Sequence, residues 1–218
     1  MNKYLISVTA LALAGTAFAN AQVLEGNYYV TMEGFFAGAT DDIVKDWQKV
    51  NIGGLWGTCG MTVDSAVPGL SFDFAGVSGI GGGSTEEDSY YSGAYEEDKI
   101  TQVDFFVGGQ AGLNYQFCER FSMSAGVMAG IDFRSSEAEL EYHDGSGYID
   151  ADDDDFDAGF FYGLFVRADT KLTQRWSLTA SYRFMGTTTK NEWNLAGIKL
   201  ETEKTNYNMV TVGAKFEF

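Results

Sequence analysis

The chain has one histidine, the residue that most often serves as a general acid or base, and this His143 stands beside Asp144 in an acidic segment. Ser135, Ser136 and Ser146 are near it in sequence, so a histidine–hydroxyl pair for ester hydrolysis or acyl transfer is one interpretation. A lone histidine among carboxylates is more often a solvated residue. We therefore expect no catalytic residue and no enzymatic activity.

Metal binding is the second chemistry that the residue types suggest. The segment Ser135–Phe156 holds nine acidic residues and no lysine or arginine. Carboxylate oxygens are the ligands that Ca²⁺ prefers, but the run lacks the glycine and asparagine spacing of a calcium loop. The sequence predicts no metal and no cofactor, and leaves one weak calcium candidate: Asp150, Asp152, Asp153, Asp154 and Asp155.

Two further features of the sequence carry little chemistry. "GIGGGS" (Gly79–Ser84) lacks the lysine of a phosphate loop, and we expect a flexible loop there. Cys59 and Cys118 would be able to pair in an oxidising compartment, but their spacing does not require a disulfide. That pairing stays open.

Alternation of apolar and polar residues predicts β-strands along most of the chain. It is clearest in five segments: 103–117, 121–134, Phe160–Leu172, Trp176–Thr187 and Tyr207–Phe218. Less regular strands are expected at Asn27–Gly38, Trp47–Cys59 and Gly69–Ile80. Short turns, with Met61–Pro68 among them, alternate with long polar connections at Gly81–Lys99, Ser135–Phe156 and Thr187–Asn206. The pattern predicts an all-β, antiparallel, up-and-down barrel of eight strands, or ten if one connection contains a hairpin.

The two faces of the five clear strands differ sharply. One face is apolar, bears no charge and has aromatic residues near the short turns. The other is rich in glycine and serine and carries eight charged residues: Asp104, Asp132, Arg134, Arg167, Asp169, Arg183, Lys215 and Glu217. Small and polar residues suit a crowded interior, and aromatic residues at strand ends suit a membrane interface. We therefore expect a transmembrane barrel whose inward charges pair with one another.

The start of the chain predicts export. Lys3, a short apolar run and small residues ending in Ala19 and Ala21 form a secretory signal peptide, residues 1–21. Residues 22–218 then make one barrel domain. The formal net charge of −17 excludes nucleic acid as a partner, because so acidic a chain repels phosphates.

The last strand, "YNMVTVGAKFEF", alternates to a terminal phenylalanine. In this it resembles the small outer-membrane β-barrel family of Gram-negative bacteria, the OmpA-like and opacity-type barrels. The resemblance implies a closed barrel in the cell outer membrane, surrounded by outer-membrane lipid and lipopolysaccharide. It also implies that the barrel-assembly machinery recognises Val210, Val212, Phe216 and Phe218, with Ala214 smaller than usual at its position. We do not expect the peptidoglycan-binding domain of OmpA.

Four functions remain open from the sequence. A structural or adhesive role, in which long acidic extracellular loops meet an unknown ligand, is the one we favour. A narrow porin-like channel is the second, because the interior is charged. A soluble secreted β-domain and a lipid A-modifying enzyme that uses His143 are the others.

Overall fold

The computed structural model describes residues 26–39, 50–91, 94–143, 147–195, 198–201 and 204–218. The predicted signal peptide, residues 1–21, lies outside these ranges and stays a prediction. Within them, no helix has both the length and the apolar character to cross a membrane. The described chain is built from antiparallel strands.

The strands are β1 (Asn27–Ala39), β2 (Ile52–Asp64), β3 (Leu70–Tyr91), β4 (Ala94–Cys118), β5 (Phe121–His143), β6 (Tyr148–Lys171), β7 (Trp176–Thr187), β8 (Glu192–Leu195), β9 (Ile198–Glu201) and β10 (Asn206–Glu217). Eight of them form a closed ring in the order β1-β10-β7-β6-β5-β4-β3-β2, and β8 pairs only with β9. The predicted eight-stranded up-and-down barrel is confirmed. The ten-stranded alternative is wrong, because the hairpin in the connection before β10 stays outside the ring.

Pairing of the first and last strands closes the barrel. β1 and β10 run antiparallel with Val30 opposite Phe216 and Phe36 opposite Val210. The amide of Phe218 donates to the carbonyl of Tyr28 at 3.1 Å, so the ladder continues to the last residue. A closed ring leaves no unpaired strand edge within it, which is what the hydrocarbon core of a membrane demands.

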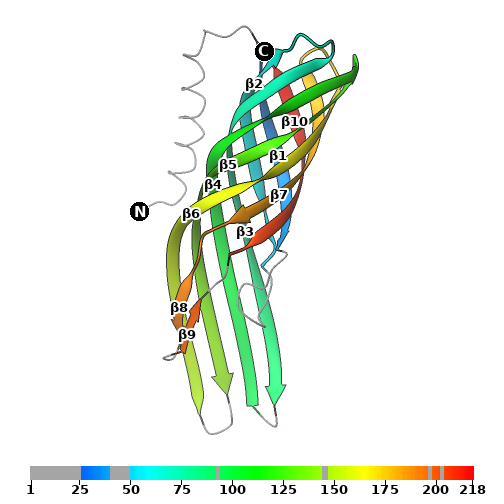
Figure 1. The fold of residues 1–218 in the computed structure, drawn as a ribbon. Coiled ribbons are helices and arrows are strands. Elements are labelled where there is room, and N and C mark those ends of the chain that lie inside the picture. The colour runs from blue at the N-terminus through cyan, green and yellow to red at the C-terminus, as the bar shows by residue number, and fades with distance from the viewer. Residues whose placement is uncertain (1–25, 40–49, 92–93, 144–146, 196–197, 202–203) are drawn as a thin grey trace.

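The strands differ in length, and this sets the shape of the molecule. β3, β4, β5 and β6 have 22 to 25 residues, whereas β1, β2, β7 and β10 have 12 or 13. The four long strands continue past the barrel at the end away from the C-terminus (Figure 1). We call the part of β3–β6 beyond Gly82, Gln102, Arg134 and Asp157 the projecting sheet.

The projecting sheet corrects three expectations. Gly81–Lys99 and Ser135–Phe156 are not loops, because unbroken ladders pair β3 with β4 out to Tyr91–Ala94, and β5 with β6 out to His143–Tyr148. Gly79–Ser84 is not a flexible loop either, since it lies within β3. Its glycines serve packing: a Cβ at Gly79 would lie 2.6 Å from the Trp56 ring.

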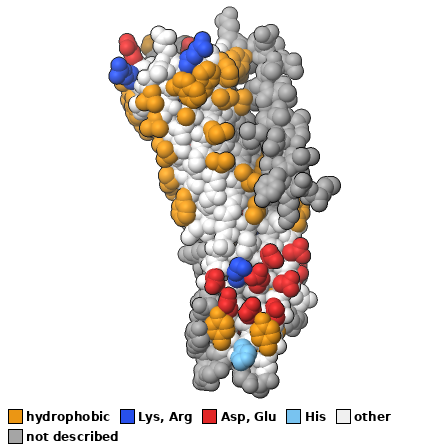
Figure 2. Space-filling view, turned by 180° about the vertical axis from the view of Figure 1, so that it is seen from behind, with side chains coloured by type: hydrophobic (Ala, Val, Ile, Leu, Met, Phe, Trp, Pro, Cys, Tyr) orange, Lys and Arg blue, Asp and Glu red, His pale blue; other side chains and the backbone are white. Residues whose placement is uncertain are grey.

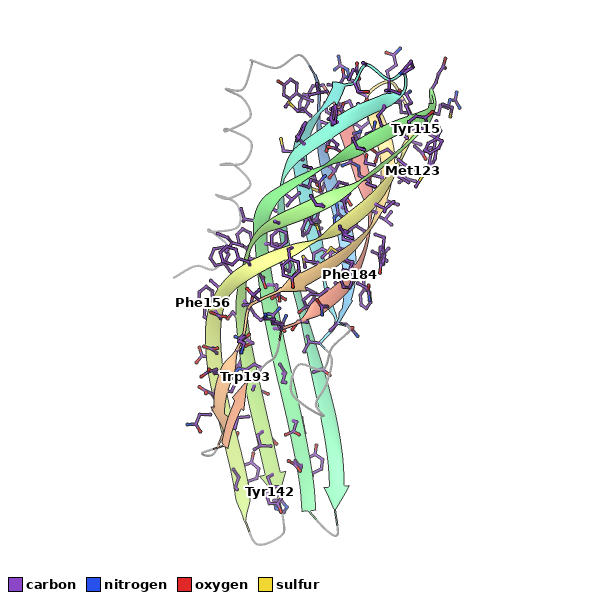
Figure 3. The ribbon with its side chains drawn as sticks, viewed as in Figure 1. Tyr115, Met123, Tyr142, Phe156, Phe184 and Trp193 are labelled. Carbon is purple, nitrogen blue, oxygen red and sulfur yellow. The ribbon has the colours of Figure 1, made fainter. Side chains whose placement is uncertain are left out.

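Bulky apolar side chains point outward from the ring and are exposed in the isolated chain; Val127 is 57% and Phe160 is 68% accessible. Aromatic side chains pack on one another near the short turns, with Trp176 and Phe216 5.0 Å apart and Tyr115 and Phe117 4.9 Å apart between ring centroids. On the face seen in Figure 2, hydrophobic side chains are spread over the barrel and acidic ones gather on the projecting sheet. Tyr115, Met123 and Phe184 are seen on the barrel, and Tyr142 near the tip of the projecting sheet (Figure 3).

Replacing Val127 with arginine tests the direction of the apolar face. The side chain points outward midway along the part of β5 within the barrel, so a charge there would enter lipid and should cost about 2–4 kcal/mol of unfolding free energy. Val127→Leu should be nearly neutral. Urea unfolding in lipid vesicles measures both, and equal stability of the two variants would contradict an outward-facing apolar surface.

Candidate functional site

The interior of the barrel holds buried ion pairs, and the first of them is centred on Arg167. Its guanidinium Nη2 lies 2.5 Å from Asp73 Oδ2 and its Nε lies 3.3 Å from Asp169 Oδ2. Nη1 donates to the Tyr29 hydroxyl at 3.1 Å, and Lys215 Nζ lies 3.1 Å from Asp169. All five side chains are buried, so each charge meets a partner rather than water.

A second ion pair joins Arg183 to Glu33 at 3.3 Å. The same Glu33 carboxylate accepts hydrogen bonds from Thr211 and Thr31, and Arg183 Nη1 donates to Thr211 at 2.9 Å. Glu33 and Asp73 were missed in the sequence, although each is the anion of a central pair. Met32, the residue before Glu33, points outward, so the alternation along β1 would have predicted that Glu33 points into the barrel.

The third group lies at the junction with the projecting sheet. Arg134 Nε donates to Asp104 at 2.7 Å, and its Nη2 lies 3.6 Å from Asp132. The Tyr207 hydroxyl accepts from Arg134 at 3.2 Å, and the Thr189 hydroxyl donates to Asp132 at 2.6 Å. The strands therefore bring all seven buried members of the predicted charge set into three groups.

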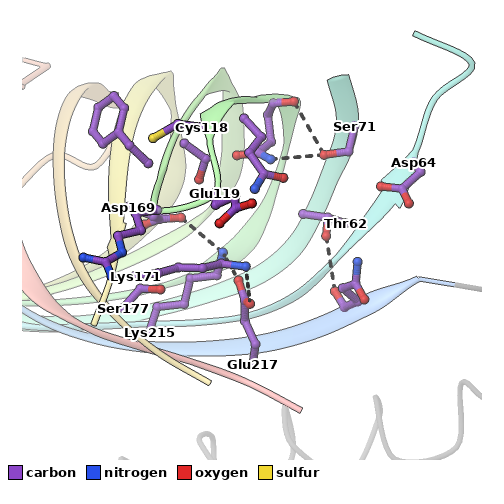
Figure 4. Close-up of a pocket in the computed structure, with 16 residues that line it drawn as sticks. Thr62, Asp64, Ser71, Cys118, Glu119, Asp169, Lys171, Ser177, Lys215 and Glu217 are labelled. Carbon is purple, nitrogen blue, oxygen red and sulfur yellow. Dashed lines mark hydrogen bonds and ion pairs between the residues drawn. The ribbon is translucent and has the colours of Figure 1, made fainter. Parts of the chain in front are cut away.

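The eighth predicted member, Glu217, lies at the mouth of the barrel beside the short turns (Figure 4). Its carboxylate is 3.0 Å from Lys215 and 3.5 Å from Lys171, and it is partly exposed. Polar side chains line a cavity of about 90 Å³ here. Lys171 was not predicted, because it stands at the end of its strand.

An aromatic layer separates the second and third groups. Trp56, Phe106 and Phe161 are fully buried, with ring centroids 5.8 to 6.4 Å apart. Trp56 is paired with Glu33 in the β1–β2 ladder, and Arg183 stacks 4.9 Å from its ring. Phe106 lies two residues from Asp104 on β4. The three rings thus place an apolar barrier across the path between the ion-pair groups.

Carboxylates of β6 hold β8 against the inner face of the projecting sheet. Asp157 accepts the amide of Lys190 at 2.8 Å, Asp155 that of Glu192 at 2.9 Å, and Asp153 that of Asn194 at 2.6 Å. We call these three residues the aspartate ladder. Side chains replace the backbone carbonyls that a neighbouring strand would normally offer.

The aspartate ladder places an apolar cover on the projecting sheet. Trp193, in β8, and Leu195 are buried in one cluster with Ile100 and Ala138 (Figure 3). Leu140 and Ala151 pack against that cluster. The described residues of the connection Thr187–Asn206, which was expected to be a loop, therefore extend the apolar core of the barrel into the projecting sheet.

The weak calcium candidate is divided between two faces. Asp150, Asp152 and Asp154 point outward, whereas Asp153 and Asp155 point inward and bind β8, because side chains alternate along a strand. In the part of the chain that the structure describes, no three acidic, cysteine or histidine side chains converge as a metal site would need. The outward aspartates instead form a charged surface, and the inward ones accept hydrogen bonds from β8.

The outer face of the projecting sheet is acidic and almost without counter-charge. Glu137 stands opposite Asp154, Glu139 opposite Asp152, and Glu141 opposite Asp150. Lys99 lies 2.8 Å from Glu139, and this hydrogen bond raises the pKa of Lys99 above its ordinary value. Like charges directly opposite one another destabilise a sheet, so this face carries an unfavourable arrangement.

His143 lies at the tip of β5, between Tyr95 and Tyr148 in the register. Ser136 is seven residues away along the same extended strand, roughly 23 Å, and Ser135 is farther still. The structure does not bring His143 to either of these hydroxyls. Ser146 lies outside the described residues. Cys59 and Cys118 are free thiols, so the predicted alternative of a disulfide is not realised.

The C-terminal strand presents its alternate residues to the outside. Val210 and Val212 are more than half exposed and Phe218 is 75% exposed. The Phe216 ring packs between Trp176 and Phe218, at 5.0 and 5.3 Å between centroids. These four side chains form one outward row on the strand that closes the barrel.

A closed antiparallel ring with paired charges inside and bulky apolar residues outside defines a transmembrane β-barrel. The family model described as "Outer membrane protein beta-barrel domain" matches residues 6–218, and the chain belongs to that family. It is thus an outer-membrane protein of Gram-negative type, and the soluble secreted alternative is wrong.

Solved structures of similar fold include three small barrels. Ail, the attachment invasion locus protein of Yersinia pestis, is 14% identical, with 89% of this chain and 100% of that chain covered and a TM-score of 0.44. OprG of Pseudomonas aeruginosa is 13% identical, covering 88% and 96%, with a TM-score of 0.42. Neisserial surface protein A is 14% identical, covering 88% and 97%, with a TM-score of 0.40. The curated proteins give no match.

Removing one ring of the aromatic layer should open the barrel to ions. We expect Phe161→Ala to raise the single-channel conductance in planar bilayers above that of the wild type, because water would then join the two polar regions. Phe161→Leu, which keeps an apolar side chain of similar reach, should stay near the wild-type value. Wild-type conductance equal to that of Phe161→Ala would show that the rings are not the barrier.

Replacing the acceptors of the aspartate ladder should release β8. We expect Asp153→Ala with Asp155→Ala to speed amide hydrogen exchange at Glu192 and Asn194, since both lose their acceptors. Asp152→Ala with Asp154→Ala is the matched control, because those side chains point outward. Unchanged exchange in the first variant would mean that the apolar cover alone holds β8.

Proposed function

We propose that this outer-membrane barrel is an adhesive protein that displays a rigid sheet outside the cell. The observation that carries the proposal is the continuity of four membrane-spanning strands into the projecting sheet. Binding surfaces gain from such rigidity, because an ordered surface loses little conformational entropy when a ligand binds. The ligand is unknown and extracellular.

The apolar core that continues into the projecting sheet supports this role. An isolated sheet with both faces in water would be marginal, but Trp193 and Leu195 cover the inner face and the aspartate ladder fixes them there. The outer face is left open and charged. A surface kept free while its opposite face is covered suits contact with a partner.

The orientation follows from the barrel. We propose that the short turns and both termini of the mature chain face the periplasm, and that the signal peptide, residues 1–21, is removed on export. Outer-membrane lipid and lipopolysaccharide would surround the apolar band. The outward row of Val210, Val212, Phe216 and Phe218 would be the segment that the barrel-assembly machinery reads.

The other functions receive less support. The aromatic layer argues against a channel, because it interrupts the polar interior. An enzyme that uses His143 would need a partner for that side chain, and neither Ser135 nor Ser136 reaches it. The interior charges are better explained as pairs that stabilise the barrel.

Cells that display the protein test the proposal. An epitope inserted at Gly145 should bind antibody on intact cells, and an epitope at Pro68 should do so only after permeabilisation. Cells with the full-length protein should be retained on a panel of immobilised extracellular proteins and polysaccharides. A variant shortened at Thr85–Ile100 and Ser136–Asp155, each hairpin closed by Asn-Gly, should assemble but not retain cells.

Two outcomes would contradict the proposal. Antibody binding at Gly145 only after permeabilisation would place the projecting sheet inside the cell. Equal retention of cells with the full-length and the shortened protein would remove the adhesive role from the sheet.

A further inference from the structure

We propose that the free edge of β6 in the projecting sheet binds an extended, lysine- or arginine-rich segment of another protein as an added β-strand. This inference rests on the proposed function, since it names the partner chemistry of the displayed sheet. Strand addition of this kind draws affinity from main-chain hydrogen bonds and specificity from side chains on alternate positions.

The edge of β6 in the projecting sheet is free because β7 ends before the projecting sheet begins. The β6–β7 ladder ends at Phe161 opposite Thr187, and one more bond joins the Thr188 amide to the Phe160 carbonyl at 2.9 Å. Thr189 then turns into the interior at the junction with the projecting sheet, where its hydroxyl donates to Asp132. Beyond it, β8 binds side chains of β6 instead of its backbone. Over 148–158, the described residues give β6 one ladder partner, β5.

The direction of the backbone groups follows from the register. The amide and the carbonyl of Phe160 both bond to Thr188, so they point away from β5. The β5–β6 register runs without a shift from Phe121–Thr170 to His143–Tyr148. Every second residue from Phe160 toward the tip, which includes Ala158, Asp154 and Asp152, therefore directs its amide and carbonyl to the free edge. The edge is about 35 Å long at the rise of a β-strand.

Charge decides which strand fits this edge. Asp150, Asp152 and Asp154 line its outer side, and a second copy of the chain would bring the same three carboxylates against them. Like charges facing one another oppose that pairing. A segment with lysine or arginine at every second position would instead place a cation beside each carboxylate. One metal ion would not neutralise them, since no three of these side chains converge among the described residues.

The ends of the edge add apolar contacts. Phe156 and Tyr148 flank the three aspartates on the outer side, and both are exposed. A partner strand would thus meet an apolar residue, three carboxylates and an apolar residue in succession. This pattern favours a cationic segment with apolar or aromatic residues at its two ends.

The test uses the refolded protein in detergent micelles and a labelled peptide of alternating lysine and threonine, with tyrosine at both ends. Fluorescence anisotropy should show binding that weakens as salt rises. The same peptide with N-methyl groups on the amides that face the edge keeps its charge but loses its donors, and should bind at least about tenfold more weakly.

Proline variants of β6 give the matching evidence from the protein. Asp152→Pro removes an amide that points to the free edge, whereas Asp152→Asn removes only the charge. Proline is tolerated at edge positions whose amide faces solvent, so the β5–β6 ladder should persist, as amide exchange along β5 would verify. We expect Asp152→Pro to weaken the peptide further than Asp152→Asn does.

The proposal is overturned by absent binding, by equal affinity for the methylated peptide, or by equal effects of Asp152→Pro and Asp152→Asn. Dimers of the purified protein joined through β6, detected by sedimentation and abolished by Asp152→Pro, would overturn it in favour of a second copy. If cells still adhere while the peptide fails to bind, only the edge assignment falls. If the Gly145 epitope proves internal, the proposed function falls whatever the purified protein binds.

Discussion

The structure depends on one constraint: at membrane depth each backbone amide and carbonyl must find its partner within the protein, because lipid offers none. Eight antiparallel strands meet this demand only when the first and the last pair, as β1 and β10 do out to Phe218. Outside the membrane water can satisfy a strand edge, so the ring need not stay closed. There β3–β6 continue alone, and β6 keeps an edge that no strand covers among the described residues.

Closing so few strands leaves an interior that side chains fill, and this explains its chemistry. Outward positions are apolar, so the inward ones hold the charges, and a buried charge is tolerated only with a partner. Arg167, Arg183 and Arg134 each have a carboxylate within 3.3 Å. Between two of these groups the buried rings of Trp56 and Phe161 pack against each other. The packing that pairs these charges therefore fills the barrel with side chains, and the proposed binding surface is the part that leaves the membrane.

The sequence predicted the ring well where alternation was unbroken, and poorly where composition opposed it. The five segments with clean apolar and polar phases, such as those that contain Val127 and Val212, indicated the fold and carry seven of the buried charges. Glu33 was missed although Met32 before it faces outward, and Asp73 was missed because alternation is broken along Gly69–Ile80. The acidic segments read as loops, since aspartate and glycine are poor strand formers. Pairing of β3, β4, β5 and β6 with one another outweighed this low strand propensity. The aspartate ladder depends on a contact with β8 that no local pattern announces.

In this structure one strand crosses the bilayer and continues, still paired, into the projecting sheet. A nitroxide scan along β5 from Ser122 to His143, with Cys59 and Cys118 replaced by alanine, tests it most directly. We predict period-two exposure throughout: odd positions meet lipid-soluble oxygen up to Phe133 and a water-soluble relaxation agent beyond it, with ordered spectra at all sites. Loss of alternation after Arg134, with the mobile spectra of a loop, would contradict the account.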